Sequence, residues 1–198
     1  MIVDMLVKGL LDEEVAARLI AHCGHRPGAA YGKRGWVYPR DNAAGFNVRA
    51  KYGDPILMLV DFMDTRLGCP PELPATWLPG RSHKMLLRAV VREIESWLLA
   101  DGAGIARFLG ISTALIPRAP EDLNDPKQTL VNLARRSRRA AVRDAIVPQP
   151  GLSATVGPGY TGALMGFVAE HWNIESALPR SASLGRCVLR LRELRDPG

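Results

Sequence analysis

Four carboxylates follow two apolar segments of the chain, at the points where those segments end. The apolar run 56–60 precedes the first pair, and the apolar segment 86–91 precedes the second pair. The carboxylates are Asp61, Asp64, Glu93 and Glu95. The carboxyl ends of parallel strands meet at one edge of a sheet, where α/β proteins bind their ligands. If the two segments are neighbouring parallel strands, we expect the four side chains to converge at that edge.

Carboxylates that converge in this way repel one another unless a cation neutralises them. Carboxylate oxygens suit Mg²⁺ or Mn²⁺, which bridge protein carboxylates and phosphate oxygens. We therefore predict a Mg²⁺ or Mn²⁺ site and phosphoryl chemistry at this edge. The alternative is that the same carboxylates cap helices and pair with Arg66, Arg88 and Arg92.

Strands and helices must position these side chains. Strands are predicted at 2–7, 56–60 and 86–91, and the run ILMLV at 56–60 is typical of a strand buried on both faces. Helices are predicted at 12–22, 93–101, 102–109, 126–145, 161–171 and 183–195. Loops are expected at 24–54 (with a short hairpin as the alternative), 66–84 and 147–159. The alternation predicts an α/β fold with a sheet of about four strands and helices on its faces.

Length and composition describe an ordinary globular protein. The chain has 198 residues, of which 47% are hydrophobic and 23% charged, so one domain, or one domain with a small appendage, is expected. No uncharged apolar stretch approaches the about 20 residues of a spanning helix, so no membrane association is predicted. The segment MIVDMLVKGLLDEE does not resemble a signal peptide, and a cytoplasmic location is expected.

The charge balance is basic, with a net charge of +6 and arginine as 21 of the 26 basic residues. The predicted helix 126–145 carries Lys127 and an arginine stripe at i, i+3, i+4 and i+8. The stripe consists of Arg135, Arg138, Arg139 and Arg143. These side chains and Arg186 are candidate contacts to a nucleic-acid backbone. The alternative is a solvated helix face, with an ordinary surface role for Arg186.

Trp97 and the segment Gly157–Gly162 have simpler interpretations. Trp97 is followed by two leucines, so we expect it in the core, where it fixes the helix that carries Glu95. The sequence GPGYTG at 157–162 lacks the lysine of a nucleotide-binding P-loop, which favours a structural turn.

Several motifs occur along the chain in a fixed order. They are G-x-x-D (9–12), an apolar strand followed by Asp61, REIESWLLAD (92–101), D-P-K (125–127) and S-x-S-L-x-R (181–186). In these motifs the chain resembles the bacterial family called domain of unknown function 4276. That family is related to the Toprim parts of overcoming-lysogenization-defect nucleases and of RloB-type proteins. The resemblance implies one Toprim-like domain over 1–198, with a mostly parallel central sheet and a helical C-terminal part from about 120.

The resemblance also implies roles for individual residues. Toprim domains carry a glutamate after the first strand and a D-x-D after a later strand, and these carboxylates bind magnesium for phosphodiester chemistry. Asp61 matches the first aspartate, and Glu95 matches the glutamate before tryptophan. Asp64 lies one residue too far for D-x-D, and Lys8 stands in V-K-G where V-E-G is expected. An ammonium group neither ligates a metal nor moves a proton at neutral pH unless its pKa is strongly lowered.

Two functions follow from the resemblance. The first is a metal-dependent nuclease in phage defence or DNA maintenance, with Asp61, Glu95 and Lys8 as its catalytic groups. Its implied partners are nucleic acid, with DNA favoured over RNA, and an ABC-type ATPase. The V-K-G departure favours the second function, a catalytically degenerate subunit that binds nucleic acid or the ATPase. A salt bridge from Lys8 to the carboxylates would favour this binding function, whereas a closed pocket would favour a small-molecule phosphoesterase.

Overall fold

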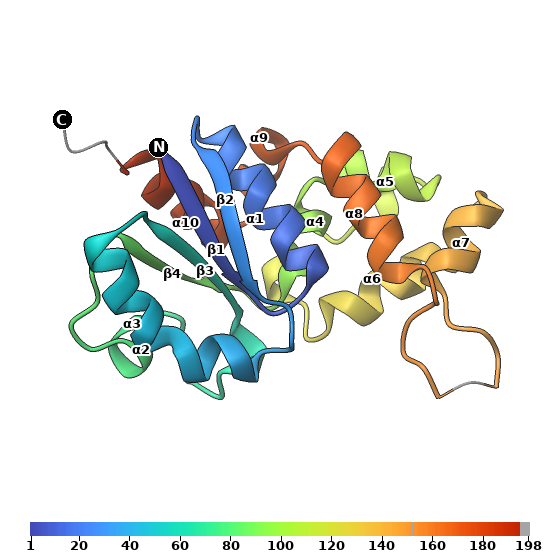
Figure 1. Cartoon of the computed structure of the whole chain (residues 1–198). Coiled ribbons are helices and arrows are strands. Elements are labelled where there is room, and N and C mark those ends of the chain that lie inside the picture. Colours follow the sequence, from blue (N-terminus) through green and yellow to red (C-terminus); the bar gives the residue numbers. More distant parts are fainter. Residues whose placement is uncertain (152, 195–198) are drawn as a thin grey trace. The chain divides into compact units, whose positions relative to one another are not determined.

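The computed structural model describes residues 1–151 and 153–194, which belong to two compact units (Figure 1). The first unit comprises Met1–Val91 and Ser183–Gly198, and the second comprises Arg92–Ala182.

The first unit contains a four-stranded, all-parallel sheet with the strand order β2-β1-β3-β4. Its strands are β1 (Ile2–Val7), β2 (Arg26–Gly32), β3 (Ile56–Asp61) and β4 (Met85–Val90). Every residue of the central strand β3 is buried, because helices cover both faces of a parallel sheet. The predicted α/β fold with about four mostly parallel strands is confirmed, as are the strands predicted at 2–7, 56–60 and 86–91.

Helices cover both faces of this sheet (Figure 1). On one face α2 (Val37–Tyr52) and α3 (Glu72–Trp77) pack against strand residues in a common apolar cluster. On the other face lie α1 (Leu10–His22) and α10 (Ala182–Arg192). A hydrogen bond of 2.8 Å between the ring of His25 and the Leu191 carbonyl links the chain after α1 to α10.

The second unit is built from helices in its described residues. They are α4 (Ile94–Ala100), α5 (Gly102–Leu109), α6 (Pro126–Ala134), α7 (Ala140–Ile146), α8 (Tyr160–Glu170) and α9 (Ile174–Ala177). Trp97 is fully buried, which confirms its predicted place in a core. Gly110 ends α5 with a φ of 66°, a left-handed conformation that glycine adopts without strain. Within 1–151 and 153–194, no helix has both the length and the apolar character needed to span a membrane.

The loop or hairpin predicted at 24–54 is wrong, because this segment forms β2 and α2. Strand β2 has the sequence RPGAAYG and lies at an edge of the sheet, so it lacks the apolar run of the central strands. In α2 only Pro39, Ala43 and Ala50 are buried, and no side chain caps the first turn. Both sequence signals of a helix, apolar periodicity and an N-cap, are therefore missing.

Two further predictions need correction. The predicted loop 66–84 contains α3, whose prolines lie before its start or in its first turn, where a missing N–H does no harm. The single helix predicted at 126–145 is divided into α6 and α7. Ser137 turns the chain between them, since its hydroxyl accepts the Arg139 N–H at 3.0 Å. The predicted end of the last helix at 195 lies outside the described residues.

Candidate functional site

In the first unit, Lys8 lies between two carboxylates at the carboxyl edge of the sheet. Lys8 follows β1, and Asp61 is the last residue of β3, the strand that pairs with β1. The Lys8 ammonium donates a hydrogen bond to Asp61 Oδ2 and lies 3.5 Å from Asp64 Oδ2. The Asp61 side chain is 1% exposed, so water screens this ion pair only weakly. The chain thus provides its own cation for these carboxylates.

The surroundings of Lys8 keep it charged. Burial alone would lower the pKa of Lys8, but the carboxylates of Asp61, Asp12 and Asp64 outweigh burial and raise this pKa above the ordinary lysine value. Asp12 lies in the first turn of α1 and is buried. Lys8 is therefore an ammonium ion at neutral pH and has no free pair to accept a proton.

The second unit contains a separate pair of buried carboxylates with its own lysine. Glu93 directly precedes α4 and Glu95 lies in its first turn, whereas Lys127 lies in the first turn of α6. Glu93 accepts the Lys127 backbone N–H at 2.7 Å and its ammonium at 3.2 Å. The same ammonium lies 3.6 Å from Glu95 Oε1. One lysine therefore serves both glutamates.

Tyr160 completes this second cluster. Its hydroxyl donates a hydrogen bond of 2.8 Å to Glu95 Oε1, and burial together with Glu95 raises the pKa of Tyr160 above its ordinary value. Burial and the neighbouring Glu95 also raise the pKa of Glu93. Glu95 Oε2 is buried and has no hydrogen-bond partner among the residues that the structure describes. Glu93 therefore keeps its proton to higher pH than an ordinary glutamate.

The predicted metal ligands form two groups, one in each unit. Asp61 and Asp64 lie together with Lys8, and Glu93 and Glu95 lie together with Lys127. No set of three or more His, Cys, Asp or Glu side chains in the described part of the chain is arranged to hold a metal ion. As arranged, each group fits an ammonium ion better than a divalent cation. The expected convergence of all four carboxylates involves both units and stays a prediction, as does the Mg²⁺ or Mn²⁺ cofactor.

The predicted arginine stripe is wrong as a feature of one helix. Arg135 ends α6, Arg138 and Arg139 lie in the connection, and Arg143 belongs to α7. Arg139 donates to the Phe108 carbonyl at 3.3 Å, and Arg143 donates to the Ser137 carbonyl at 3.0 Å. Because the chain leaves the helix between α6 and α7, the four arginines do not share the regular i, i+3, i+4, i+8 face of one helix.

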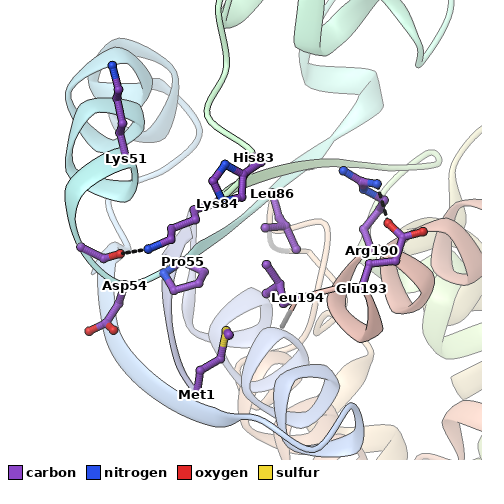
Figure 2. Close-up of a pocket in the computed structure, with 11 residues that line it drawn as sticks. Met1, Lys51, Asp54, Pro55, His83, Lys84, Leu86, Arg190, Glu193 and Leu194 are labelled. Atoms are coloured by element: carbon purple, nitrogen blue, oxygen red, sulfur yellow. Dashed lines mark hydrogen bonds and ion pairs between the residues drawn. The ribbon is translucent and has the colours of Figure 1, made fainter. Parts of the chain in front are cut away.

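A pocket of about 820 Å³ lies at the opposite edge of the sheet, where the strands begin, in the first unit (Figure 2). Met1, Pro55 and Lys84 lie there, each directly before a strand. The Lys84 ammonium donates to the Gly53 carbonyl at 3.1 Å. Parallel sheets bind ligands at the carboxyl ends of their strands, so the Lys8 cluster has the more favourable position for a functional site.

Sequence reasoning missed two features of these clusters. Nothing near Tyr160 indicates that it reaches Glu95, which lies 65 positions away in the sequence. The sequence favours Lys127 as a nucleic-acid contact because it begins a basic segment, and no local signal indicates its contacts with Glu93 and Glu95. Comparisons of the chain with family models, with curated proteins and with solved structures found no match, so the resemblance stays a prediction from motifs.

Proposed function

We propose that this protein is a Toprim-like nucleic-acid-binding subunit in which Lys8 replaces the divalent cation of a nuclease. The observation that carries this proposal is the ion pair of Lys8 with Asp61 at the carboxyl edge of the sheet. The ammonium neutralises the carboxylate that a metal-dependent reaction would use. The protein then holds the phosphate backbone without cutting it.

A simple estimate of charge repulsion supports this proposal. Two unit charges about 4 Å apart interact by about 4 kcal/mol at an effective dielectric constant of about 20. A divalent cation bound to Asp61 beside the Lys8 ammonium would therefore be repelled by about 8 kcal/mol on the same estimate. Metal binding would require Lys8 to leave, and the raised pKa of Lys8 prevents it from losing its charge instead.

The charge of the chain supports nucleic acid as the ligand. The net charge of +6 and the 26 basic residues favour a polyanionic partner. Binding to the backbone would be salt-sensitive, because each phosphate contact releases counterions. The resemblance adds an ABC-type ATPase as a second partner and phage defence as the setting.

A second candidate function is a metal-dependent phosphodiesterase that uses Glu93 and Glu95. It is favoured by the buried Glu95 Oε2, which lacks a hydrogen-bond partner among the described residues, and by the raised pKa of Glu93. Two neighbouring carboxyl groups, of which Glu93 has a raised pKa, suit general acid–base chemistry. Lys127 would have to give up its contacts with both glutamates for Mg²⁺ or Mn²⁺ to bind there.

Binding and cleavage measured on the same substrates distinguish these functions. Labelled single-stranded DNA, duplex DNA and RNA are titrated with the protein at about 50 and 200 mM salt, and each is then incubated with Mg²⁺ or Mn²⁺. We expect binding that weakens strongly with salt and no cleavage of any substrate. Cleavage that is lost in Glu95→Gln would establish the second candidate, and cleavage that is lost in Asp61→Ala would contradict the role given to Lys8.

A further inference from the structure

Edge strand β4 borders a cleft in the first unit. Among the described residues, β4 has β3 as its neighbour on one side and no strand on the other. A cleft of about 440 Å³ lies along this free edge, lined by residues 87–89 and the prolines at 70, 71 and 74. Ser183 and Arg186 of α10 also line the cleft. Its polar lining therefore includes an arginine from β4 and an arginine from α10.

Four arginines, one from β4, two from α10 and one from the segment before β4, form one group, here called the arginine cluster. The cluster consists of Arg81, Arg88, Arg186 and Arg190. Arg186 and Arg190 are four residues apart and so share one side of α10. Figure 2 shows Arg190 beside its ion-pair partner Glu193. Arg190 also lines the pocket of about 820 Å³ at the edge of the sheet where the strands begin. The cluster thus extends from that pocket to the cleft along β4.

The positive charge of the arginine cluster exceeds the negative charge of the carboxylates that pair with it. Within residues 1–151 and 153–194, no carboxylate lies at ion-pair distance from Arg81, Arg88 or Arg186. Arg88 is half-buried, and its Nε donates to the Leu87 carbonyl at 2.6 Å. Like charges in a partly buried place repel one another, and each arginine has more N–H donors than these contacts use. A bound anion would remove the repulsion and accept those donors.

The repulsion between these guanidinium groups also contributes to a lowered pKa of two arginines of the cluster. Burial lowers the pKa of Arg88, and Arg81, Arg190 and Arg186 lower it further, whereas Cys187 opposes them. Burial and Arg190 likewise lower the pKa of Arg81. Arginine stays charged at neutral pH in spite of such shifts, so the cluster keeps its positive charge.

We propose that the arginine cluster binds the phosphates of a nucleic-acid backbone along edge strand β4. Guanidinium groups match phosphate oxygens with paired N–H donors, which makes arginine well suited to this contact. This inference rests on the proposed nucleic-acid-binding function and assigns it a surface. That surface differs from the predicted stripe at 135–143, where two of the arginines bind backbone carbonyls of the protein.

The test measures binding of the full chain to a fluorescein-labelled single-stranded oligonucleotide by fluorescence anisotropy over a range of salt concentrations. The cluster variant carries Arg88→Gln and Arg186→Gln. The matched control carries Arg135→Gln and Arg138→Gln, two exposed arginines of the second unit, and so loses the same charge. We expect the cluster variant to bind at least about 10-fold more weakly and the control to lose less than about 3-fold. The slope of log affinity against log salt should fall by about 1.4 in the cluster variant, about 0.7 for each lost contact.

The outcomes separate this inference from the function on which it rests. A control that loses as much affinity as the cluster variant overturns the inference and leaves the proposed function intact. A wild-type chain that binds no oligonucleotide contradicts the proposed function itself. Inorganic phosphate should displace the wild-type oligonucleotide complex only at millimolar concentration, because one phosphate makes few of the contacts. Tighter binding of polyglutamate than of the oligonucleotide would assign the cluster to an acidic protein and overturn the inference.

Folding of the variants is checked by circular dichroism. Arg88 is half-buried, so the variant with Arg186→Gln alone provides a second test that changes only an exposed side chain. This single variant should bind about 3-fold more weakly, with a slope that is lower by about 0.7. An unchanged affinity and slope in a folded Arg186→Gln variant would count against the cluster.

Discussion

Replacing Lys8 by methionine is expected to lower the free energy of unfolding by about 3–5 kcal/mol at neutral pH. The substitution keeps the length of the side chain but removes the ammonium that pairs with Asp61, whose side chain is 1% exposed. A buried carboxylate that loses the ammonium of its ion pair is costly, because little water reaches it to replace the lost charge. Urea unfolding followed by circular dichroism measures the difference.

Two controls show whether the lost charge causes the effect. Lys33→Met removes an exposed ion pair with Glu13 and should change the free energy of unfolding by less than about 1 kcal/mol. Adding Asp61→Asn to Lys8→Met also removes the carboxylate charge that Lys8 neutralises, so the double variant should recover most of the loss. Equal effects of Lys8→Met and Lys33→Met would show that the Lys8 pair contributes no more than a surface pair.

The pH dependence of this effect follows from the raised pKa of Lys8. A group whose pKa rises on folding contributes stability that is fully present below its unfolded pKa, about 10.4 for lysine, and lost as the pH rises through the folded value. The wild-type protein should keep the contribution between about pH 6 and pH 9. The difference between wild type and Lys8→Met should shrink in acid, where protonation of the carboxyl groups removes the negative charge that Lys8 neutralises.

Lys127→Met is expected to lower the free energy of unfolding by about 2 kcal/mol at neutral pH, less than Lys8→Met. Lys127 serves two buried glutamates, but its own side chain is 37% exposed, so water already weakens these pairs. Its backbone N–H remains to bind Glu93 Oε1 after the substitution. Urea unfolding of the two methionine variants side by side gives the comparison.

Acid should relieve the Lys127→Met defect. Burial and Glu95 raise the pKa of Glu93 in the wild-type protein, whereas Lys127 lowers it, so removing Lys127 raises this pKa further. An acid with a raised folded pKa contributes stability below its unfolded pKa and loses it as the pH rises through the folded value. The defect should therefore grow with rising pH above about 4.3. Two variants serve as controls: Lys127→Arg keeps the charge, and Lys51→Met removes an exposed lysine. Their free energies of unfolding should stay near that of the wild type. A Lys127→Met defect of equal size at all pH values would exclude charge as its cause.

The central part of the fold could be predicted from the sequence because its signals are local. A run of five apolar residues at 56–60 indicates a strand buried on both faces, and Gly110 indicates the end of a helix. Strand β2 and helix α2 have no such signals, since each exposes much of its length and buries mainly small residues. Their structure depends on the sheet edge and face that they cover, which the local sequence does not encode.

The sequence predicted which residues lie at the candidate site, but not which of them contact one another. The positions of Asp61 and Lys8 after two apolar strands predicted that they lie at the carboxyl edge of the sheet, and the structure brings them into contact. The arginine helix failed because one buried serine, Ser137, turns the chain in the middle of a segment with a helical pattern. Contacts between distant segments, such as Tyr160 with Glu95, depend on packing alone.

In the proposed function Lys8 is the resident cation of Asp61, and a manganese titration tests this role most directly. Mn²⁺ binding is followed by electron paramagnetic resonance for the wild type, Lys8→Glu, Asp61→Asn and the variant with both substitutions. The wild-type chain should bind no Mn²⁺ that depends on Asp61. The Lys8→Glu variant should gain a site that the added Asp61→Asn removes, because a carboxylate then replaces the ammonium beside Asp61 and Asp64. A wild-type chain that binds Mn²⁺ and loses it on Asp61→Asn would contradict the account.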